Sequence, residues 1–142
     1  MLSHVVIRWL IPVYIIDNMM LRSYKGGHTA FLERKAPKDL ANAIIKDLEV
    51  VTPSAETPVR RLSGGNVQKV LVGREIASNP TVLMVAYPVR GLDVNSSYLI
   101  YDLLNKQKEH GTSVIFVGED LDVLIELCDR IMVMNSGKVT GI

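Results

Sequence analysis

The chain alternates between amphipathic segments and short apolar runs. Apolar residues recur at the three- and four-residue spacing of a helix in four segments, at 40–48, 67–77, 99–104 and 121–128. Continuous apolar runs, which are typical of strands buried in a parallel sheet, lie at 82–85, 113–117 and 131–134. Because strands and helices alternate along the chain, the pattern predicts an α/β fold built on a parallel sheet.

The polar residues between the apolar ones define the ends and faces of these helices. Pro80 ends the second helix, since a proline ring cannot continue one. His110 and Gly111 are typical of the end of the third, where histidine favours the helix dipole and glycine the left-handed cap. Lys69 and Arg74 fall between the apolar positions of the second helix. We therefore expect them on its solvent-facing side.

The first apolar stretch, at 5–16, has a different character. It is only a dozen residues long and contains Arg8 and Pro12. A membrane-spanning helix needs about 20 residues. A secretory signal would have a positive charge before the apolar stretch and a small-residue cleavage site after it. We interpret the stretch as a buried strand or an interface segment, left exposed by loss of upstream sequence.

Composition excludes several classes of function. Sixteen basic and fifteen acidic residues give a net charge of +1, so the overall charge does not indicate nucleic acid as a partner. The single cysteine, Cys128, rules out an internal disulfide and suits a reducing compartment. Its place in the helical pattern predicts a buried structural thiol. His4, His28 and His110 lack the spacing of metal ligands, and we predict no metal site.

The sequence Leu-Ser-Gly-Gly-Asn begins at residue 62, directly before the second amphipathic segment. Ser63 is a favoured helix N-cap. Gly64 and Gly65 carry no side chains, so a bulky anion can approach the backbone. The helix that follows directs its positive end and free N–H groups toward such an anion. The alternative is a glycine-containing turn that caps an ordinary core helix.

The order of three segments adds a resemblance to this local chemistry. Residues 62–66, the apolar run at 82–85 and Arg-Gly-Leu-Asp at 90–93 resemble the signature motif, Walker B strand and D-loop of ATP-binding cassette (ABC) transporter ATPases. Leu-Ser-Gly-Gly-Asn-x-Gln-Lys together with Arg-Gly-Leu-Asp-Val is similar to the second cassette of simple-sugar and nucleoside importers. The resemblance covers about residues 17–142.

This resemblance implies a partial P-loop NTPase-like domain. Residues 1–142 would form an incomplete ABC ATPase domain, with a helical subdomain at about 17–79 that carries the signature motif. The remaining α/β core would occupy about 80–142. The N-terminal β-lobe of the family and its Walker A loop, Gly-x-x-x-x-Gly-Lys-Ser/Thr, have no counterpart in the sequence. We expect a sheet edge and an apolar face to be uncovered as a result.

The chain departs from the family where hydrolysis takes place. Ala86 and Tyr87 stand where the family has the Asp of the magnesium shell and the catalytic Glu, and Glu119 replaces the switch His. A phenol, with a pKa of about 10, is a poor base at neutral pH. Glu119 or Asp120 could replace the lost base only within about 3 Å of the attacking water. We predict no catalytic residue, and no ATP hydrolysis by this chain alone.

The residues that serve the opposite nucleotide in the family's head-to-tail dimer are present. The resemblance assigns six of them to nucleotide held by a partner cassette: Ser63, Gly64, Gly65, Asn66, Gln68 and Asp93. The cofactor would be ATP bound in trans, with magnesium held by the partner and none bound by this chain.

The resemblance predicts part of an ATP-binding subunit of an ABC importer of the sugar or nucleoside type, which couples ATP hydrolysis to transport. Its partners would be a second ABC ATPase cassette and integral membrane permease subunits. Its location would be cytoplasmic and peripheral, at the inner face of the cell membrane. The alternatives are a non-catalytic module that docks on a permease, and a truncated gene remnant.

Overall fold

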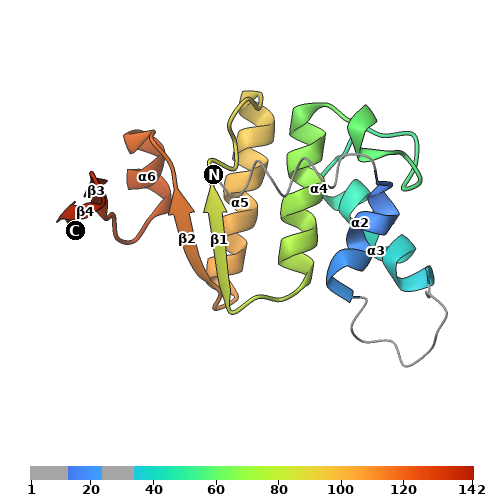
Figure 1. The fold of residues 1–142 in the computed structure, drawn as a ribbon, viewed down its shortest axis with the longest axis horizontal. Coiled ribbons are helices and arrows are strands. Elements are labelled where there is room, and N and C mark those ends of the chain that lie inside the picture. The colour runs from blue at the N-terminus through green and yellow to red at the C-terminus, as the bar shows by residue number, and fades with distance from the viewer. Residues whose placement is uncertain (1–12, 24–33) are drawn as a thin grey trace.

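The computed structural model describes residues 13–23 and 34–142, which contain six helices and four strands. In chain order these are α2 (Ile15–Ser23), α3 (Lys35–Asp47), the 3-10 helix η2 (Val59–Arg61), α4 (Gly64–Ala77), β1 (Val82–Ala86), α5 (Val94–Glu109), β2 (Ser113–Val117), α6 (Leu121–Leu127), β3 (Val133–Asn135) and β4 (Lys138–Gly141). Figure 1 shows α2, α3 and α4 grouped at one end, with β1, β2 and α5 in the middle and β3–β4 at the far end.

The first core lies among α2, α3 and α4. Its buried members include Ile15, Met19, Ala41, Ile44, Leu48, Val59 and Val70. The apolar stripe predicted for 40–48 is therefore confirmed, since it faces this core. α3 and α4 approach closely at Gly73, where an added Cβ would lie 2.8 Å from Ile44 Cγ2 and 3.0 Å from Leu48 Cδ1. Glycine at this position allows the two helices to touch.

The second core lies between the sheet and the helices α4 and α5. β1 and β2 pair in parallel, with Val82 opposite Ser113 and Ala86 opposite Val117. The buried residues of this core are Val72, Leu83, Ile100 and Leu104. The α/β architecture and the parallel pairing predicted from the apolar runs are confirmed.

The third strand predicted at 131–134 is present but shifted to Val133–Asn135, and it lies outside the parallel sheet. The strand β3 begins at Val133 and pairs antiparallel with β4, through Met134 opposite Val139, in a separate two-stranded sheet. The reversal takes place at Ser136 and Gly137, whose φ angles of 49° and 76° form a tight turn. An apolar run that is followed directly by such a turn makes a hairpin, so it does not join a parallel sheet.

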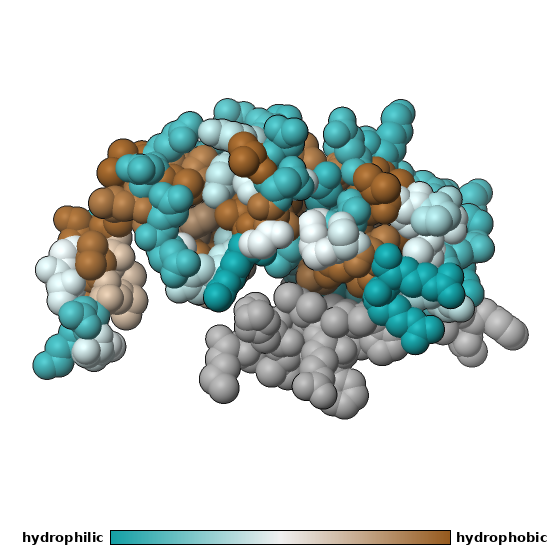
Figure 2. Space-filling model, turned by 90° about the horizontal axis from the view of Figure 1, so that it is seen from above, coloured by the Kyte–Doolittle hydropathy of each residue, from teal (hydrophilic) through white to brown (hydrophobic). Residues whose placement is uncertain are grey.

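The predicted apolar stripe at 121–128 forms a helix, but it is not buried. Leu121 and Ile125 of α6 are exposed. Figure 2 shows apolar surface around α6 and the hairpin. Cys128 follows the last residue of α6 and is half-buried, which corrects the expectation of a buried helical thiol.

The first apolar stretch lies mostly outside the described residues, since its positions 5–12 are not among them. At its described end it is helical: Ile15 and Ile16 are buried and begin α2, and only Tyr14 makes an isolated bridge, to Pro58. The strand prediction is therefore wrong for these last two positions. Across residues 13–23 and 34–142, no helix combines the length and the apolar character needed to cross a bilayer.

Candidate functional site

The site begins at the N-terminus of α4. Ser63 is the N-cap, as predicted, with extended backbone angles of −64° and 159°. Its Oγ accepts a hydrogen bond from the Asn66 backbone N–H at 3.4 Å and one from Asn66 Nδ2 at 2.9 Å. Ser63 and Gly64 are both exposed. The helix therefore begins at the surface, with its cap open to solvent.

Asn66 connects this end of α4 to the segment that follows α3. Its Oδ1 accepts a hydrogen bond from the Val51 backbone N–H at 3.0 Å, while its Nδ2 donates to Ser63. Both ends of the amide are thus used within the chain. Asn66 fixes the position of the cap, and Gln68, in the second turn of the helix, is half-buried.

The two glycines have different surroundings. A Cβ added to Gly64 would have no heavy atom within 4 Å, whereas one added to Gly65 would lie 3.5 Å from Leu92 Cδ2 and 4.0 Å from Ser96 Oγ. Gly64 therefore leaves open space in front of the helix, and Gly65 is where residues 92 and 96 approach it. This contact brings the signature motif beside the loop at 90–93.

Asp93 is the N-cap of α5, and its Oδ1 accepts a hydrogen bond from the Ser96 backbone N–H at 2.9 Å. This bond, assisted by the Ser96 hydroxyl, lowers the pKa of the exposed carboxyl below its ordinary value. Gly91, at a φ of 78°, allows the turn that leads into the cap. In Figure 1 the first turns of α4 and α5 lie at the same edge of the molecule as the carboxyl ends of β1 and β2.

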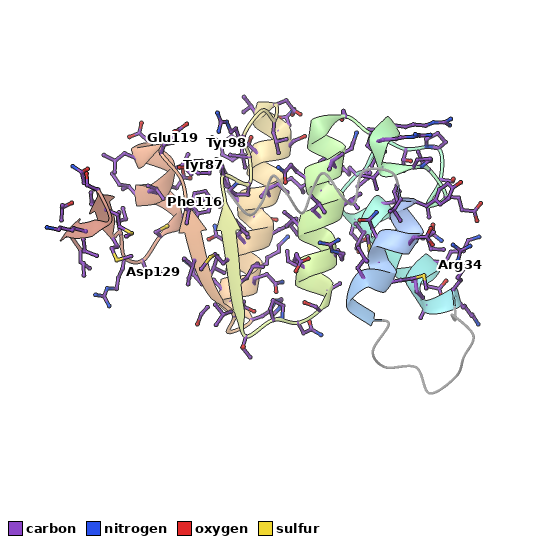
Figure 3. All side chains as sticks on the ribbon, in the orientation of Figure 1. Arg34, Tyr87, Tyr98, Phe116, Glu119 and Asp129 are labelled. Carbon is purple, nitrogen blue, oxygen red and sulfur yellow. The ribbon has the colours of Figure 1, made fainter. Side chains whose placement is uncertain are left out.

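The residues that depart from the family lie at that same edge. Ala86 is the last residue of β1, and Tyr87 follows it with a φ of 50° and donates its backbone N–H to Val117 O at 2.8 Å. Figure 3 shows Tyr87 and Glu119 at this end of the sheet. Asp120 caps α6, with Oδ1 accepting from the Asp122 N–H at 3.1 Å. Its carboxylate is therefore engaged in capping, which argues against a role as a substitute for the catalytic base.

Lys69 and Arg74 are buried, contrary to the expectation that they face solvent. Each retains an exposed fraction of only 8%. Lys69 Nζ donates to Glu49 O at 3.4 Å, and Arg74 pairs with Glu75 Oε1 at 2.7 Å. A long aliphatic stem can be buried in this way while the charged head reaches a polar atom. Polar–apolar spacing alone does not reveal this behaviour.

A surface pocket of about 340 Å³ lies beside the capped ends of α4 and α5, and sequence reasoning missed it. Its lining is Glu49, Lys69, Asn95, Ser96, Tyr98, Leu99 and Asp102. Because the residues come from three separate segments, only the tertiary packing brings them together. In the part of the chain that the structure describes, no cluster of His, Cys, Asp and Glu residues could hold a metal ion.

Comparisons with known proteins identify the family. No family model matches the chain. It is 37% identical over 126 residues to the ribose import ATP-binding protein RbsA of Oceanobacillus iheyensis and 36% identical over 127 residues to the xylose import ATP-binding protein XylG of Moorella thermoacetica. Each alignment covers 89% of this chain and 25% of the relative. The chain thus spans about a quarter of the length of the curated relatives it matches.

Solved structures of ATP-binding cassettes also match the chain. The ATP-binding cassette MJ0796, in a dimeric structure bound to ADP and Pi, matches with a TM-score of 0.78 and 28% identity, over 93% of this chain and 57% of that one. A nucleotide-free cassette from an ABC transporter matches in fold with a TM-score of 0.71 at 18% identity, over 94% of this chain and 56% of that one. With its sugar-import homologues and its shared fold, this chain belongs to the ABC transporter ATPases and corresponds to part of one ATP-binding cassette.

Proposed function

We propose that this chain is part of an ATP-binding subunit of a sugar or nucleoside importer and acts on ATP held by a second cassette. The relatives named above are import proteins for ribose and xylose, which supports a sugar as the transported solute. ATP and its magnesium ion would be gripped by the opposite cassette. This chain would complete the site with its signature motif and D-loop.

The observation that carries the proposal is the open end of α4 beside the cap of α5. Ser63 is exposed, and the space in front of Gly64 is free of heavy atoms to 4 Å. The first N–H groups of a helix have no partner within the helix, and its dipole is positive there. A terminal phosphate held by a partner would therefore meet backbone donors together with the Ser63 hydroxyl.

Asp93 has a different role in this proposal. A carboxylate repels a phosphate, so direct contact with the nucleotide would be unfavourable. Its hydrogen bond with the Ser96 N–H fixes the start of α5, and Ser96 and Leu92 lie beside Gly65. We assign Asp93 to holding the D-loop against the signature motif, where it can meet the opposing cassette.

Hydrolysis is assigned to the partner's residues. At the carboxyl edge of this chain's sheet, Ala86 offers no oxygen to a metal ion and Tyr87 is a weak base. Coupling to transport would use permease subunits, with the protein at the cytoplasmic face of the membrane.

The division into a helical subdomain at about 17–79 and an α/β core at about 80–142 belongs to the same proposal. The first core is built mainly from α2, α3 and α4, and the second from the sheet with α4 and α5. α4 takes part in both. A movement of the helical part would thus be transmitted to the sheet through the helix that carries the signature motif.

The test is a reconstituted pair of this chain with a complete cassette from the Oceanobacillus iheyensis ribose import protein. Ser63→Arg places a bulky cation in the approach to the α4 amides and should abolish ATP turnover by the pair while assembly persists. Ser78→Arg is the matched control, because Ser78 is an exposed serine at the opposite end of the same helix. Unchanged turnover with Ser63→Arg, or ATP hydrolysis by the chain alone, would refute the proposal.

A further inference from the structure

The surface pocket beside the capped ends of α4 and α5 is formed where three segments meet. Helix α5 supplies most of its wall, through four residues at three- and four-residue spacing that share one helical face: Asn95, Tyr98, Leu99 and Asp102. α4 contributes Lys69, and the turn after α3 contributes Glu49. Its volume of about 340 Å³ is near the lower end of the range for ligand pockets, about 300–1,000 Å³, so it suits a small ligand. We call it the α5 pocket.

Lys69 is the buried charged residue of the α5 pocket. Its exposed fraction is 8%, and its Nζ donates a hydrogen bond to Glu49 O at 3.4 Å. Glu49 has a φ of 49°, a left-handed conformation that is uncommon for residues other than glycine. An ammonium group carries three donors, and this long bond uses one of them. Lys69 therefore has donors to offer to a ligand in the pocket.

The charges in the wall of the α5 pocket largely cancel. The ammonium of Lys69 stands against the carboxylates of Glu49 and Asp102, and Asp102 Oδ2 is also paired with Lys106 Nζ at 2.6 Å. The two carboxylates would repel an anion such as phosphate, and Lys69 would repel a cation. No group of His, Cys, Asp and Glu within the described ranges could hold a metal ion. The wall therefore favours a ligand without net charge.

The polar groups of the wall are of the kinds that recognise hydroxyl groups. A hydroxyl both donates and accepts, so it can pair with an ammonium, a carboxylate, an amide or another hydroxyl. The wall offers all four kinds, from Lys69, Glu49, Asn95 and Ser96. An apolar ligand would take these groups out of water without giving them partners, which costs free energy. The chemistry therefore favours a ligand with several hydroxyl groups.

Tyr98 adds an apolar surface on which a sugar ring can pack. Its exposed fraction is 61%, and its ring meets that of Tyr101 edge to face, with centroids 6.3 Å apart and an interplanar angle of 86°. Figure 3 shows Tyr98 near the start of α5. The face of an aromatic ring is electron-rich, so it attracts the weakly positive C–H groups of a sugar. An exposed aromatic ring beside polar groups is the combination that a monosaccharide needs.

We propose that the α5 pocket binds a neutral polyhydroxylated ligand of the monosaccharide class. Its hydroxyl groups would pair with Lys69, Glu49 and Asn95, and its ring would lie on Tyr98. This inference goes beyond the proposed function and does not rest on it, because Ser63 is not part of the pocket wall.

Ser96 connects the α5 pocket with the neighbouring D-loop. It lines the pocket, and its backbone N–H donates to Asp93 Oδ1 at 2.9 Å. A bound sugar would therefore lie beside the cap of α5 while leaving the open end of α4 free. Binding of the sugar and turnover by the reconstituted pair can thus be measured separately.

The test is a titration of the full, isotope-labelled chain with D-ribose, D-xylose and D-galactose, followed through its amide NMR signals. The signals of Asn95, Ser96 and Tyr98 should shift, with a dissociation constant of about 1 mM or lower for at least one sugar. Tyr98→Ala and Asn95→Ala should each weaken binding at least tenfold. Tyr87→Ala is the matched control, because Tyr87 is an exposed tyrosine outside the pocket wall. Circular dichroism should show all three variants folded, since each replaces an exposed side chain.

The outcomes separate the classes of ligand. Sugar binding that Tyr87→Ala and Ser63→Arg leave intact, and that Tyr98→Ala and Asn95→Ala weaken, supports the proposal. It is overturned if none of the three sugars shifts these signals, or if both pocket variants bind as tightly as the unmodified chain. Inorganic phosphate and glycine are the charged probes. If either binds at the same amides more tightly than every sugar, the pocket belongs to an anion or a zwitterion and the proposal is wrong.

Discussion

Replacing Gly64 with alanine should affect the stability of the fold and the activity of the proposed site in different ways. The φ of Gly64 is not in the left-handed region, and nothing lies within 4 Å of the position its Cβ would take. Alanine is favoured over glycine within a helix by about 0.5–1 kcal/mol, and less at its first position. Gly64→Ala should therefore leave the free energy of unfolding unchanged or raise it by up to about 0.5 kcal/mol.

The same substitution should damage the proposed site. A methyl group at Gly64 stands in front of the first N–H groups of α4, where the partner's phosphate would approach. We expect turnover by the reconstituted pair to fall at least tenfold, which corresponds to about 1.4 kcal/mol of transition-state stabilisation. Urea unfolding of the chain and an ATPase assay of the pair measure the two effects.

Gly73→Ala is the control, because it should lower the free energy of unfolding. The new Cβ would lie 2.8 Å from Ile44 Cγ2 and 3.0 Å from Leu48 Cδ1, and both side chains are buried. Overpacking costs about 1–3 kcal/mol, whereas the gain in helix propensity is about 1 kcal/mol, so we expect a net loss of up to about 2 kcal/mol. Combining it with Ile44→Ala, which removes the contacted atoms, should make the two costs non-additive.

Two results would refute this reasoning. If Gly64→Ala retains full turnover, the amides of the first turn do not meet the nucleotide, and the glycine serves only the local turn. If Gly73→Ala stabilises the chain by about 1 kcal/mol, α3 and α4 do not pack as described. Because the two glycines lie on one helix, a general effect of Gly→Ala substitution in α4 would affect both variants alike.

Three further predictions follow from caps and titrating groups. Ser63→Ala removes the acceptor for the Asn66 N–H at 3.4 Å, and a bond this long should cost about 0.5–1 kcal/mol of stability in urea unfolding, whereas Ser78→Ala should cost less because it leaves the N-cap intact. The hydrogen bonds from Ser96 lower the pKa of Asp93, so its charge stabilises the fold above the ordinary pKa of 3.8, and this stabilisation is lost as pH falls through the lower pKa of the folded state. The difference in stability between the unmodified chain and Asp93→Asn should therefore close below about pH 4. A difference that does not change with pH would contradict the assignment. Burial raises the pKa of the Cys128 thiol, so maleimide labelling at pH 7 should be slower than for a free thiol, and Asp129→Asn should accelerate it because Asp129 contributes to the upward shift.

The spacing of apolar residues predicts the helices and strands whose formation depends on nearby residues in the sequence. The stripe at 40–48 became α3 because its apolar residues share one helical face, and the runs at 82–85 and 113–117 became β1 and β2. The run at 131–134 has the same composition, but the turn at Ser136 and Gly137 folds it into a hairpin. Its partner in the sheet is a tertiary property that apolar spacing does not contain.

The candidate site also contains some features that the sequence predicts and others that it does not. Ser63 as an N-cap follows from its side chain and from the glycines after it, so the sequence predicts it directly. The contact of Gly65 with Leu92 joins residues that are 27 positions apart (92 − 65), and the sequence analysis did not predict it. The burial of Lys69 was missed because a lysine stem packs as an apolar group while its ammonium reaches Glu49 O.

The two surfaces of the molecule differ in how far they depend on a partner. The start of α4 is held by the first core and by the Val51–Asn66 hydrogen bond, all within this chain. The β1–β2 sheet, in contrast, leaves Met84 and Ile115 exposed on one face, and covering these apolar side chains would lower the free energy. The second core should therefore be less stable than the first, and hydrogen exchange should be faster in β1 and β2 than in α3 and α4.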